Sequence, residues 1–596
     1  IAMPHSIRQR TNPNSPYMRK NGPKWRNQQN SEAVNPTNAY EYGLSFPTGY
    51  TAFKALISAR VVSAIWSHIS DCDETFNYWE PGHYMLYGKG LQTWEYSPKY
   101  ALRSYTYLLF QLVPAFLYNA VLRPDKLFIF YFQRCLLAVT CSACEVYFYK
   151  SVCREFGIHV GRLTLIFQLF SAGMYVASSA FLPSTFSMYM TMLSIGAWYH
   201  RKYELAVFLT ALSSFLSWPF AALIGVPIAI DMLFMRKDLM KFTKWCIISL
   251  CIILLPMVRI DSLYFGRLTV APLNIVMYNV FSTHGPDLYG VEPWYYYVLN
   301  GFLNFNFIYL SALVTPIALL AVSKLVSVNA RNPACLPYSL SILPLYLWLM
   351  VFTLQPHKEE RFLFPIYPLI CLCGALTVDA MQKLYFRVFV RTGQHYLHHT
   401  SHLVFPTVFI TSLLGVTRIL ALYKGYHAPM DTYMELSKMT AEGNLPTLNY
   451  FNICVGKEWY RFPSSFFLPD DRWNLMFLKS EFRGQLPKYY AEESGTSIIP
   501  DYMNDVNKEE PTRYGNVTSC HFLVDLDLST SSEFEPNYSQ QIEKWVLVKS
   551  IPFLDNYRTR KWVRAFYIPY IWEKNVVWGS YNLLQARKMR VQPSKY

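Results

Sequence analysis

Charged side chains are scarce in this sequence of 596 residues, at 16% of the total, whereas soluble proteins carry about 25%. Hydrophobic residues make up 52%, and the mean hydropathy is +0.12. The apolar residues are gathered into runs of roughly 17 to 25, the length that crosses about 30 Å of hydrocarbon as a helix. Together these features exclude an ordinary soluble protein and predict a polytopic α-helical membrane protein.

Several common motifs are also missing. The sequence has no Gly-rich phosphate loop, no dinucleotide fingerprint and no internal repeat, which argues against a soluble nucleotide-binding domain. The net charge of +15 does not indicate nucleic acid, because the basic residues lie in short loops and in the N-terminal tail, without any nucleic-acid-binding motif. This distribution is typical of cytoplasmic loops of membrane proteins, so we predict a lipid bilayer and no nucleic acid as a partner.

Residues 1–48 lack apolar periodicity and are rich in Asn, Pro, Arg and Lys. We predict a disordered basic tail in the cytosol. It has no apolar core of the kind found in cleavable signal peptides, so the first spanning helix is expected to direct insertion.

The positive-inside tendency constrains the topology. If every apolar segment crosses, the loops around Lys150 and Arg236 lie outside the cytosol, against that tendency. Counting 101–149 as one crossing places both basic loops in the cytosol and gives about eleven transmembrane helices. Segment 101–121 would then lie flat on the membrane or re-enter it. The apolar segments are 52–69, 101–121, 127–149, 160–182, 184–200, 203–217, 219–235, 243–261, 296–325, 337–356, 362–383 and 401–424.

An odd number of crossings places the C-terminal region on the side opposite the cytosolic tail. We therefore predict a transmembrane domain, 49–424, and a C-terminal lumenal domain, 425–596. Glycosylation sequons at Asn516 and Asn537 agree with a lumenal location. Alternating apolar and polar residues at 521–527 and 544–548 predict strands, and therefore a small mixed α/β domain. An oxidising lumen permits a disulfide between Cys454 and Cys520, but the sequence leaves their pairing open.

Three polar loops fall on the lumenal side: 70–100, 260–293 and 355–362. Acids beside a bilayer are costly, so a cluster of them is a functional-site hypothesis. The first loop has four within ten residues, followed by Arg103, and the last has a compact basic and acidic cluster. The candidates are Asp71, Asp73, Glu74, Trp79, Glu80 and Arg103, with His357, Lys358, Glu359, Glu360 and Arg361.

Acids in one loop and cations in another suit the transfer of a group from a phosphate-linked donor to a hydroxyl. A carboxylate accepts the proton of the hydroxyl, and Lys, Arg or His holds the departing phosphate. One base suffices, whereas a retaining glycosidase needs two carboxylates at a fixed separation. Structural alternatives stay open: loop acids paired with Arg103, a salt-bridge network at 357–361, and Trp79 as an interface anchor.

The motifs themselves resemble a known family. Asp73-Glu74, Tyr78-Trp79-Glu80 and the string 93–96, together with His357–Phe362, resemble glycosyltransferase family 22, the lipid-dependent mannosyltransferases of GT-C fold. The resemblance covers roughly residues 50–425. Many members have His-Pro before the Asp-Glu pair, whereas this chain has Asp71-Cys72, which blurs the choice of base.

The resemblance implies inverting transfer of mannose from dolichyl-phosphate mannose to a dolichyl-pyrophosphate high-mannose oligosaccharide, with α-1,2 linkages, at the lumenal face of the endoplasmic reticulum. Asp73 ranks first as the base, then Asp71 and Glu74. No cofactor or metal is expected, because the donor is not a nucleotide pyrophosphate. The remaining candidates bind donor phosphate or sugar: His357, Lys358 and Arg361 with phosphate, Glu359 and Glu360 with these cations or mannose, and Trp79, Glu80 and Arg103 with substrate.

The rival hypothesis is a transporter or lipid flippase with acidic coupling residues. Transporters place charged residues near the bilayer midplane, often in repeated halves. Here the acids lie at one predicted membrane surface and the sequence has no visible repeat.

Overall fold

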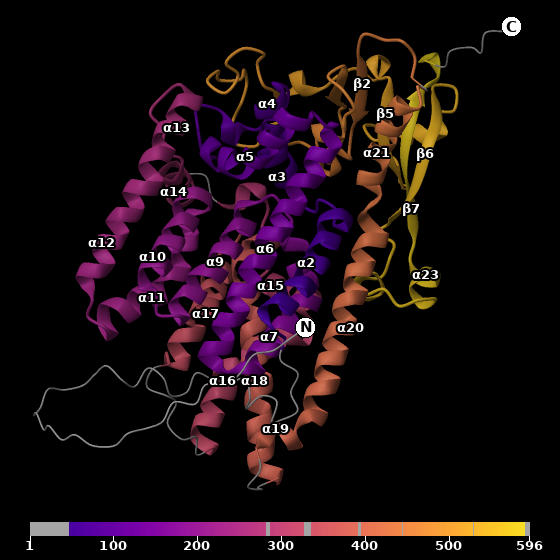
Figure 1. Cartoon of the computed structure of the whole chain (residues 1–596). Coiled ribbons are helices and arrows are strands. Elements are labelled where there is room, and N and C mark those ends of the chain that lie inside the picture. The colour runs from indigo at the N-terminus through magenta and orange to yellow at the C-terminus, as the bar shows by residue number, and fades with distance from the viewer. Residues whose placement is uncertain are drawn as a thin grey trace, which may run out of the picture.

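A computed structural model describes residues 47–281, 286–326, 335–390, 395–443, 445–528 and 530–589. Residues 1–46 of the predicted tail lie outside this range. Long helices form a bundle and short helices lie above it. The strands lie at the upper right in this view, next to α21, Ala428–Ala441 (Figure 1). The main bundle helices are α2 Gly49–Trp66, α6 Lys126–Phe156, α7 Ile158–Phe170, α9 Pro183–Tyr199, α10 Tyr203–Leu212, α12 Leu239–Ser249, α13 Leu255–Phe265, α14 Ala271–Phe281, α15 Tyr296–Phe305, α16 Phe307–Leu325, α17 Tyr338–Leu354, α18 Tyr367–Tyr385 and α20 Ser401–Tyr426.

The membrane-spanning character of the bundle is clear from helix length and composition. Among the described residues, six helical stretches are long and apolar enough to cross a membrane, and five shorter apolar helices accompany them. One of the six is α5, Tyr105–Leu122, which Figure 1 places beside α3 and α4 above the bundle. That location agrees with a flat segment at 101–121, but the count of eleven crossings stays a prediction.

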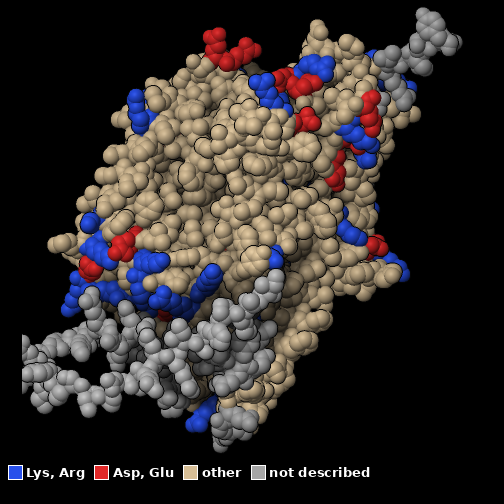
Figure 2. Space-filling model, viewed as in Figure 1, with Lys and Arg blue, Asp and Glu red and all other residues tan. Residues whose placement is uncertain are grey.

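Charge separates the two ends of the bundle. The last turns of α6, α16 and α18 carry Arg154, Lys324 and Lys383. Figure 2 shows Lys and Arg side chains gathered toward the lower end of this face, below a broad band with almost no charge. A band without charge between polar ends is what a bilayer requires of a protein surface.

A buried ion pair ties three bundle helices together. Arg60 of α2 donates to both carboxylate oxygens of Glu145 of α6, at 3.0 and 2.6 Å, and to the carbonyl of Gln168 of α7 at 2.7 Å. Both charged side chains are fully buried. The second carboxylate contact and the carbonyl supply hydrogen bonds that partly offset the loss of hydration.

The C-terminal part has the predicted mixed α/β structure. Helix α21, Ala428–Ala441, leads into a five-stranded sheet of order β3-β2-β5-β7-β6, in which β2 pairs parallel with β3 and β5. The other pairings are antiparallel. Cys454 on β2 is bonded to Cys520 just before β5. The strands are β2 Phe451–Val455, β3 Trp473–Phe477, β5 Phe522–Asp527, β6 Trp545–Leu554 and β7 Trp578–Ala586.

The two predicted glycosylation asparagines differ in their surroundings. Asn516 is exposed, and its Oδ1 accepts hydrogen bonds from the backbone and hydroxyl of Thr518. Asn537 is partly buried, and its amide nitrogen donates to Asp527 at 2.6 Å. Asn516 is therefore the more accessible acceptor, and modification of either residue stays a prediction.

The Arg60–Glu145 pair yields a stability prediction. Glu145→Gln leaves a buried guanidinium without its counter-charge and should lower the free energy of unfolding by about 3–5 kcal/mol. The control is Glu204→Gln, since Glu204 pairs with Lys241 through side chains that are 38% and 35% exposed. That change should cost at most about 1 kcal/mol. Thermal unfolding of the purified variants measures both, and equal losses would contradict the assignment.

Candidate active site

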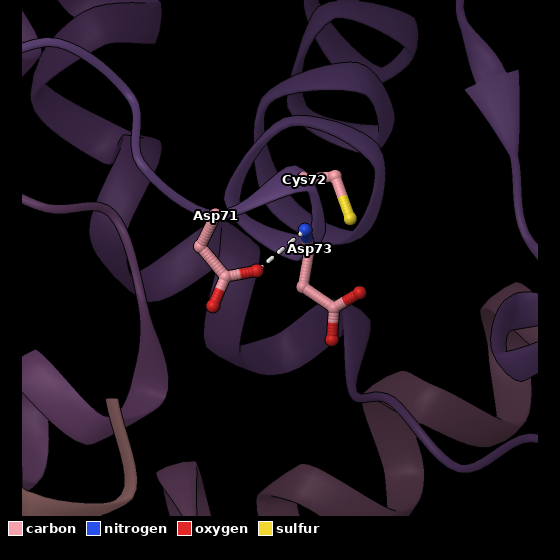
Figure 3. Close-up of side chains that lie close together, drawn as sticks. All are labelled: Asp71, Cys72 and Asp73. Atoms are coloured by element: carbon pink, nitrogen blue, oxygen red, sulfur yellow. Dashed lines mark hydrogen bonds between the residues drawn. The ribbon is translucent and has the colours of Figure 1, made fainter. Parts of the chain in front are cut away.

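The acidic loop begins with a capped helical turn. Helix α3, Cys72–Glu74, is capped by Asp71, whose side chain accepts a hydrogen bond from the backbone N–H of Asp73 at 2.9 Å. Figure 3 shows the carboxylates of Asp71 and Asp73 pointing to the same side, with the thiol of Cys72 close to them. Local capping thus places two aspartates on one face of the turn.

Arg361 joins this turn to the second cluster. Its Nη1 lies 2.9 Å from Asp71 and its Nη2 2.6 Å from Asp73, and it also pairs with Glu359. The Arg361 side chain is 13% exposed. The structure therefore brings 71–73 and 359–361 together, although they are separated by some 290 positions in the chain.

A second arginine approaches the same oxygen of Asp73. Arg103 lies 3.7 Å from Asp73, pairs with Glu95 at 2.8 Å and donates to the hydroxyl of Tyr78 at 2.8 Å. Asn77 donates to the other oxygen of Glu95 at 2.5 Å. This network fixes Arg103, and it includes Asn77 and Glu95, which the sequence analysis did not select.

The two aspartates have different proton affinities. Burial raises the pKa of Asp71 to about 7, against the opposing effect of Arg361. Burial also raises the pKa of Asp73, but Arg361 and Arg103 outweigh it and leave that pKa below its usual value. At neutral pH Asp73 is ionised, while Asp71 is close to its titration midpoint. Separated pKa values of this kind are typical of catalytic carboxylates.

The basic residues of the second cluster have unequal access to a ligand. His357 is 22% exposed and hydrogen-bonds Glu359 at 2.8 Å, which raises the pKa of the imidazole. Lys358 is 6% exposed, and its ammonium donates to the carbonyls of Glu292, Gln355 and Pro356. Lys358 therefore holds the loop in place, which does not support the predicted contact with phosphate.

Glu360 points toward helix α15. Its carboxylate accepts hydrogen bonds from Asn300 and Asn304, each at 3.0 Å. It does not share the contact that Glu359 makes with Arg361. These two asparagines are spaced by one helical turn. The sequence analysis did not select them, because two asparagines within an apolar segment do not by themselves indicate a site.

Three other predicted residues are structural anchors. Glu74 accepts from the Trp79 indole and from the backbone of Phe181, both at 3.0 Å, and points away from Arg361. Trp79 is fully buried against Phe130, with ring centroids 4.3 Å apart, so it is neither a sugar platform nor an interface anchor. Its apolar neighbours bury the whole ring, which corrects the prediction for this residue.

Glu80 belongs to the same group, because it accepts from the backbone and hydroxyl of Ser465 and from the backbone of Leu91. Burial raises the pKa of Glu80 to about 7. Its contacts join the acidic loop to the C-terminal domain instead of facing Arg361. Beside it, β1 Leu91–Gln92 pairs with β4 Lys488–Tyr489, an arrangement that the sequence did not predict.

The site also offers a group of possible metal ligands. Ligand atoms of Asp71, Cys72 and Asp73 lie within 4.8 Å of one another. However, the guanidinium of Arg361 already contacts both aspartates, and its positive charge opposes a cation at the same place. The donor set is therefore a poor fit for a divalent ion in this arrangement.

The central role of Arg361 can be tested without an activity assay. In Arg361→Gln, Asp71 and Asp73 lose their shared cation, so the pKa of Asp71 should rise further above its unfolded value and the lowered pKa of Asp73 should rise as well. The partly exposed cluster should then lose about 1–3 kcal/mol at pH 8, and the loss should shrink as pH falls and the carboxylates take up protons.

Thermal unfolding of Arg361→Gln and wild type between pH 5.5 and 8 measures this difference. Arg361→Lys keeps the charge and serves as the control. A destabilisation of Arg361→Gln that does not change with pH would show that the carboxylates do not depend on Arg361.

Comparison with known proteins agrees with the motifs of this site. Residues 51–469 match the Alg9-like mannosyltransferase family. The chain is 50% identical over 550 residues to Drosophila melanogaster alpha-1,2-mannosyltransferase Alg9, covering 91% of this chain and 88% of that protein. Identity to the Homo sapiens protein ALG9 is also 50%, covering 91% and 90%. The Saccharomyces cerevisiae ALG9 is 31% identical, covering 85% and 90%.

Among solved structures, the crystal structure of ArnT from Cupriavidus metallidurans bound to undecaprenyl phosphate is similar with a TM-score of 0.48 and 12% identity, covering 80% of this chain and 92% of that one. The predicted fold class, a GT-C-type helical membrane domain with a C-terminal α/β domain, is confirmed by the helices, the sheet and the family match. The chain belongs to the Alg9-like mannosyltransferase family.

Proposed function

We propose that this membrane mannosyltransferase transfers mannose from dolichyl-phosphate mannose to a dolichyl-pyrophosphate-linked oligosaccharide, forming α-1,2 bonds. The names of its relatives support the linkage. The observation that carries the mechanism is the contact of Arg361 with both Asp71 and Asp73, because it places a base beside a cation that can hold phosphate. We further propose that the reaction takes place at the lumenal face of the endoplasmic reticulum.

The proposed step is a single displacement. The acceptor 2-hydroxyl oxygen attacks C1 of mannose while the bond from C1 to the phosphate oxygen breaks. The hydroxyl proton moves to a carboxylate, and dolichyl phosphate leaves with the bonding electrons. Attack opposite the leaving group converts a β-linked donor into an α-linked product. His357 and Arg361 neutralise the phosphate as its charge develops.

Asp73 is the proposed base. It is ionised at neutral pH, and both of its arginine contacts use the same oxygen, Oδ2. Asp71 uses Oδ1 both to cap α3 and to bind Arg361, so its role is to position the turn and the guanidinium. The raised pKa of Asp71 makes it the alternative base, because a base with a pKa near the working pH is efficient.

Replacing each aspartate separates these roles. Asp73→Asn should lower kcat by a factor on the order of 100 to 10,000, since it removes proton acceptance and keeps the shape. Asp71→Asn retains a capping side chain and should lose less. Cys72→Ser changes the residue between the two aspartates without removing a carboxylate, and it is the control for the turn. Transfer of radiolabelled mannose to a synthetic lipid acceptor measures all three, and a larger loss in Asp71→Asn would assign the base to Asp71.

We also propose that no divalent metal takes part. Arg361 occupies the position between the aspartates where an ion would bind, so a chelator should leave the rate within about twofold of the untreated enzyme. Mannose transfer before and after treatment with excess EDTA measures this. A loss of activity that Mn²⁺ or Mg²⁺ restores would contradict the proposal.

A further inference from the structure

A second cationic region lies beside the aspartates, around the end of α2. Arg134 of α6 donates to the hydroxyl of Ser179 at 3.4 Å, and Ser179 is 3.1 Å from Ser63 of α2. Arg134 follows the first residue of α6, Lys126, by eight positions, or about 12 Å along the helix. This arginine therefore lies next to the last turns of α2, below the end of α6 that connects to α5.

Helix α20 lies on the other side of the same end of α2. The rings of Trp66 and Tyr423 stack at 5.2 Å, and those of His68 and Tyr426 at 5.9 Å. Arg418 precedes the last residue of α20, Tyr426, by eight positions, again about 12 Å along the helix. The two arginines therefore lie at similar distances from the upper ends of their helices.

Both guanidinium groups have unused hydrogen-bond donors. Nε and Nη1 of Arg134 and Nε of Arg418 are buried without a partner, and Arg134 is only 1% exposed. Nη1 of Arg418 donates to the carbonyl of Ala565 at 3.1 Å. Among the described residues, neither arginine has a carboxylate within ion-pair distance, in contrast to Arg60, whose charge is matched by Glu145. A buried cation without a partner is unfavourable unless an anion joins it.

Other charges around His68 do not neutralise this region. Burial lowers the pKa of His68 to about 3, and the neighbouring basic groups His427, Arg134, Arg418 and Arg461 act in the same direction. His427 is matched by Asp431, and Arg461 by Glu458. The surplus positive charge therefore comes from Arg134 and Arg418.

The acids nearest to these two arginines are already held elsewhere. Glu74 interacts electrostatically with Arg134 from beyond ion-pair distance, and Glu360 interacts with Arg418 in the same way. Glu74 accepts from Trp79 and the backbone of Phe181, while Glu360 accepts from Asn300 and Asn304. Neither carboxylate satisfies the unused guanidinium donors.

We propose that Arg134 and Arg418, together with the neighbouring His68, bind the pyrophosphate of the lipid-linked acceptor. The inference rests on the proposed function, in which both substrates are phosphate-bearing lipids and each needs cationic groups at the same membrane face. Arg361 is engaged by three carboxylates and serves the donor. His68 precedes Asp71 by three residues, and His68 and Arg418 are partly exposed while Arg134 is buried, so a ligand reaches this site, adjacent to the base, from the side of His68 and Arg418.

The test combines ligand-induced stabilisation with kinetics on the purified full-length protein. Farnesyl pyrophosphate should raise the thermal unfolding temperature of wild type, and Arg134→Met and Arg418→Met should abolish that shift. Their KM for the lipid-linked acceptor should rise about tenfold or more, with the KM for dolichyl-phosphate mannose changed by less than about twofold. Arg162→Met removes a partly buried arginine near the start of α7 and is the control.

The site would be overturned if the farnesyl pyrophosphate shift of the unfolding temperature survived in both variants, or if the donor KM rose as much as the acceptor KM. It would also be overturned if phosphatidic acid shifted the unfolding temperature of wild type equally, which would indicate an ordinary phospholipid. Arg418→Met carries the test if Arg134→Met does not fold. If wild type transfers no mannose but its farnesyl pyrophosphate shift is lost in the variants, the anion site stands and the proposed function fails.

Discussion

The contact of Arg361 with three carboxylates is the interaction on which the site depends. Asp71, Asp73 and Glu359 would repel one another beside a low-dielectric membrane domain, and one guanidinium contacts all three. The same contact joins the loop after α2 to the loop after α17. Arg361 therefore links the two loops at this surface and, together with Arg103, lowers the pKa of the proposed base.

The C-terminal domain fixes the acidic loop from above. Glu80 accepts two hydrogen bonds from Ser465, and Thr75 donates to the carbonyls of Phe462 and Pro463. Lys89 donates to three oxygens of residues 471–474. With the β1–β4 pairing, these contacts make the domain part of the structure that positions the aspartates, so its removal would disturb the site even though none of its residues contacts Arg361 among the described interactions.

Sequence reasoning predicted the features that follow from composition and spacing. The apolar runs, the strands near 521–527 and 544–548, and the meeting of residues 71–73 with residue 361 all follow from periodicity, charge and motif. It did not separate carboxylates that face the site from those that face the core. Glu74 directly follows Asp73 and Glu80 belongs to the same loop, but their carboxylates face the backbone of Phe181 and Ser465. The full burial of Trp79 could not be predicted for the same reason, because burial depends on tertiary packing, and the phosphate contact of Lys358 stays a prediction.

The central claim is that Asp73 accepts the proton of the attacking hydroxyl opposite a phosphate held by Arg361 and His357. A structure of the enzyme with a non-transferable dolichyl-phosphate mannose analogue and a lipid-linked acceptor tests it most directly. The account predicts the Asp73 carboxylate within about 3.2 Å of the acceptor 2-hydroxyl, on the face of mannose opposite the phosphate. A structure in which Asp71 occupies that position would contradict it. So would a structure in which Asp73 contacts only Arg361, on the phosphate side of mannose, and not the acceptor hydroxyl.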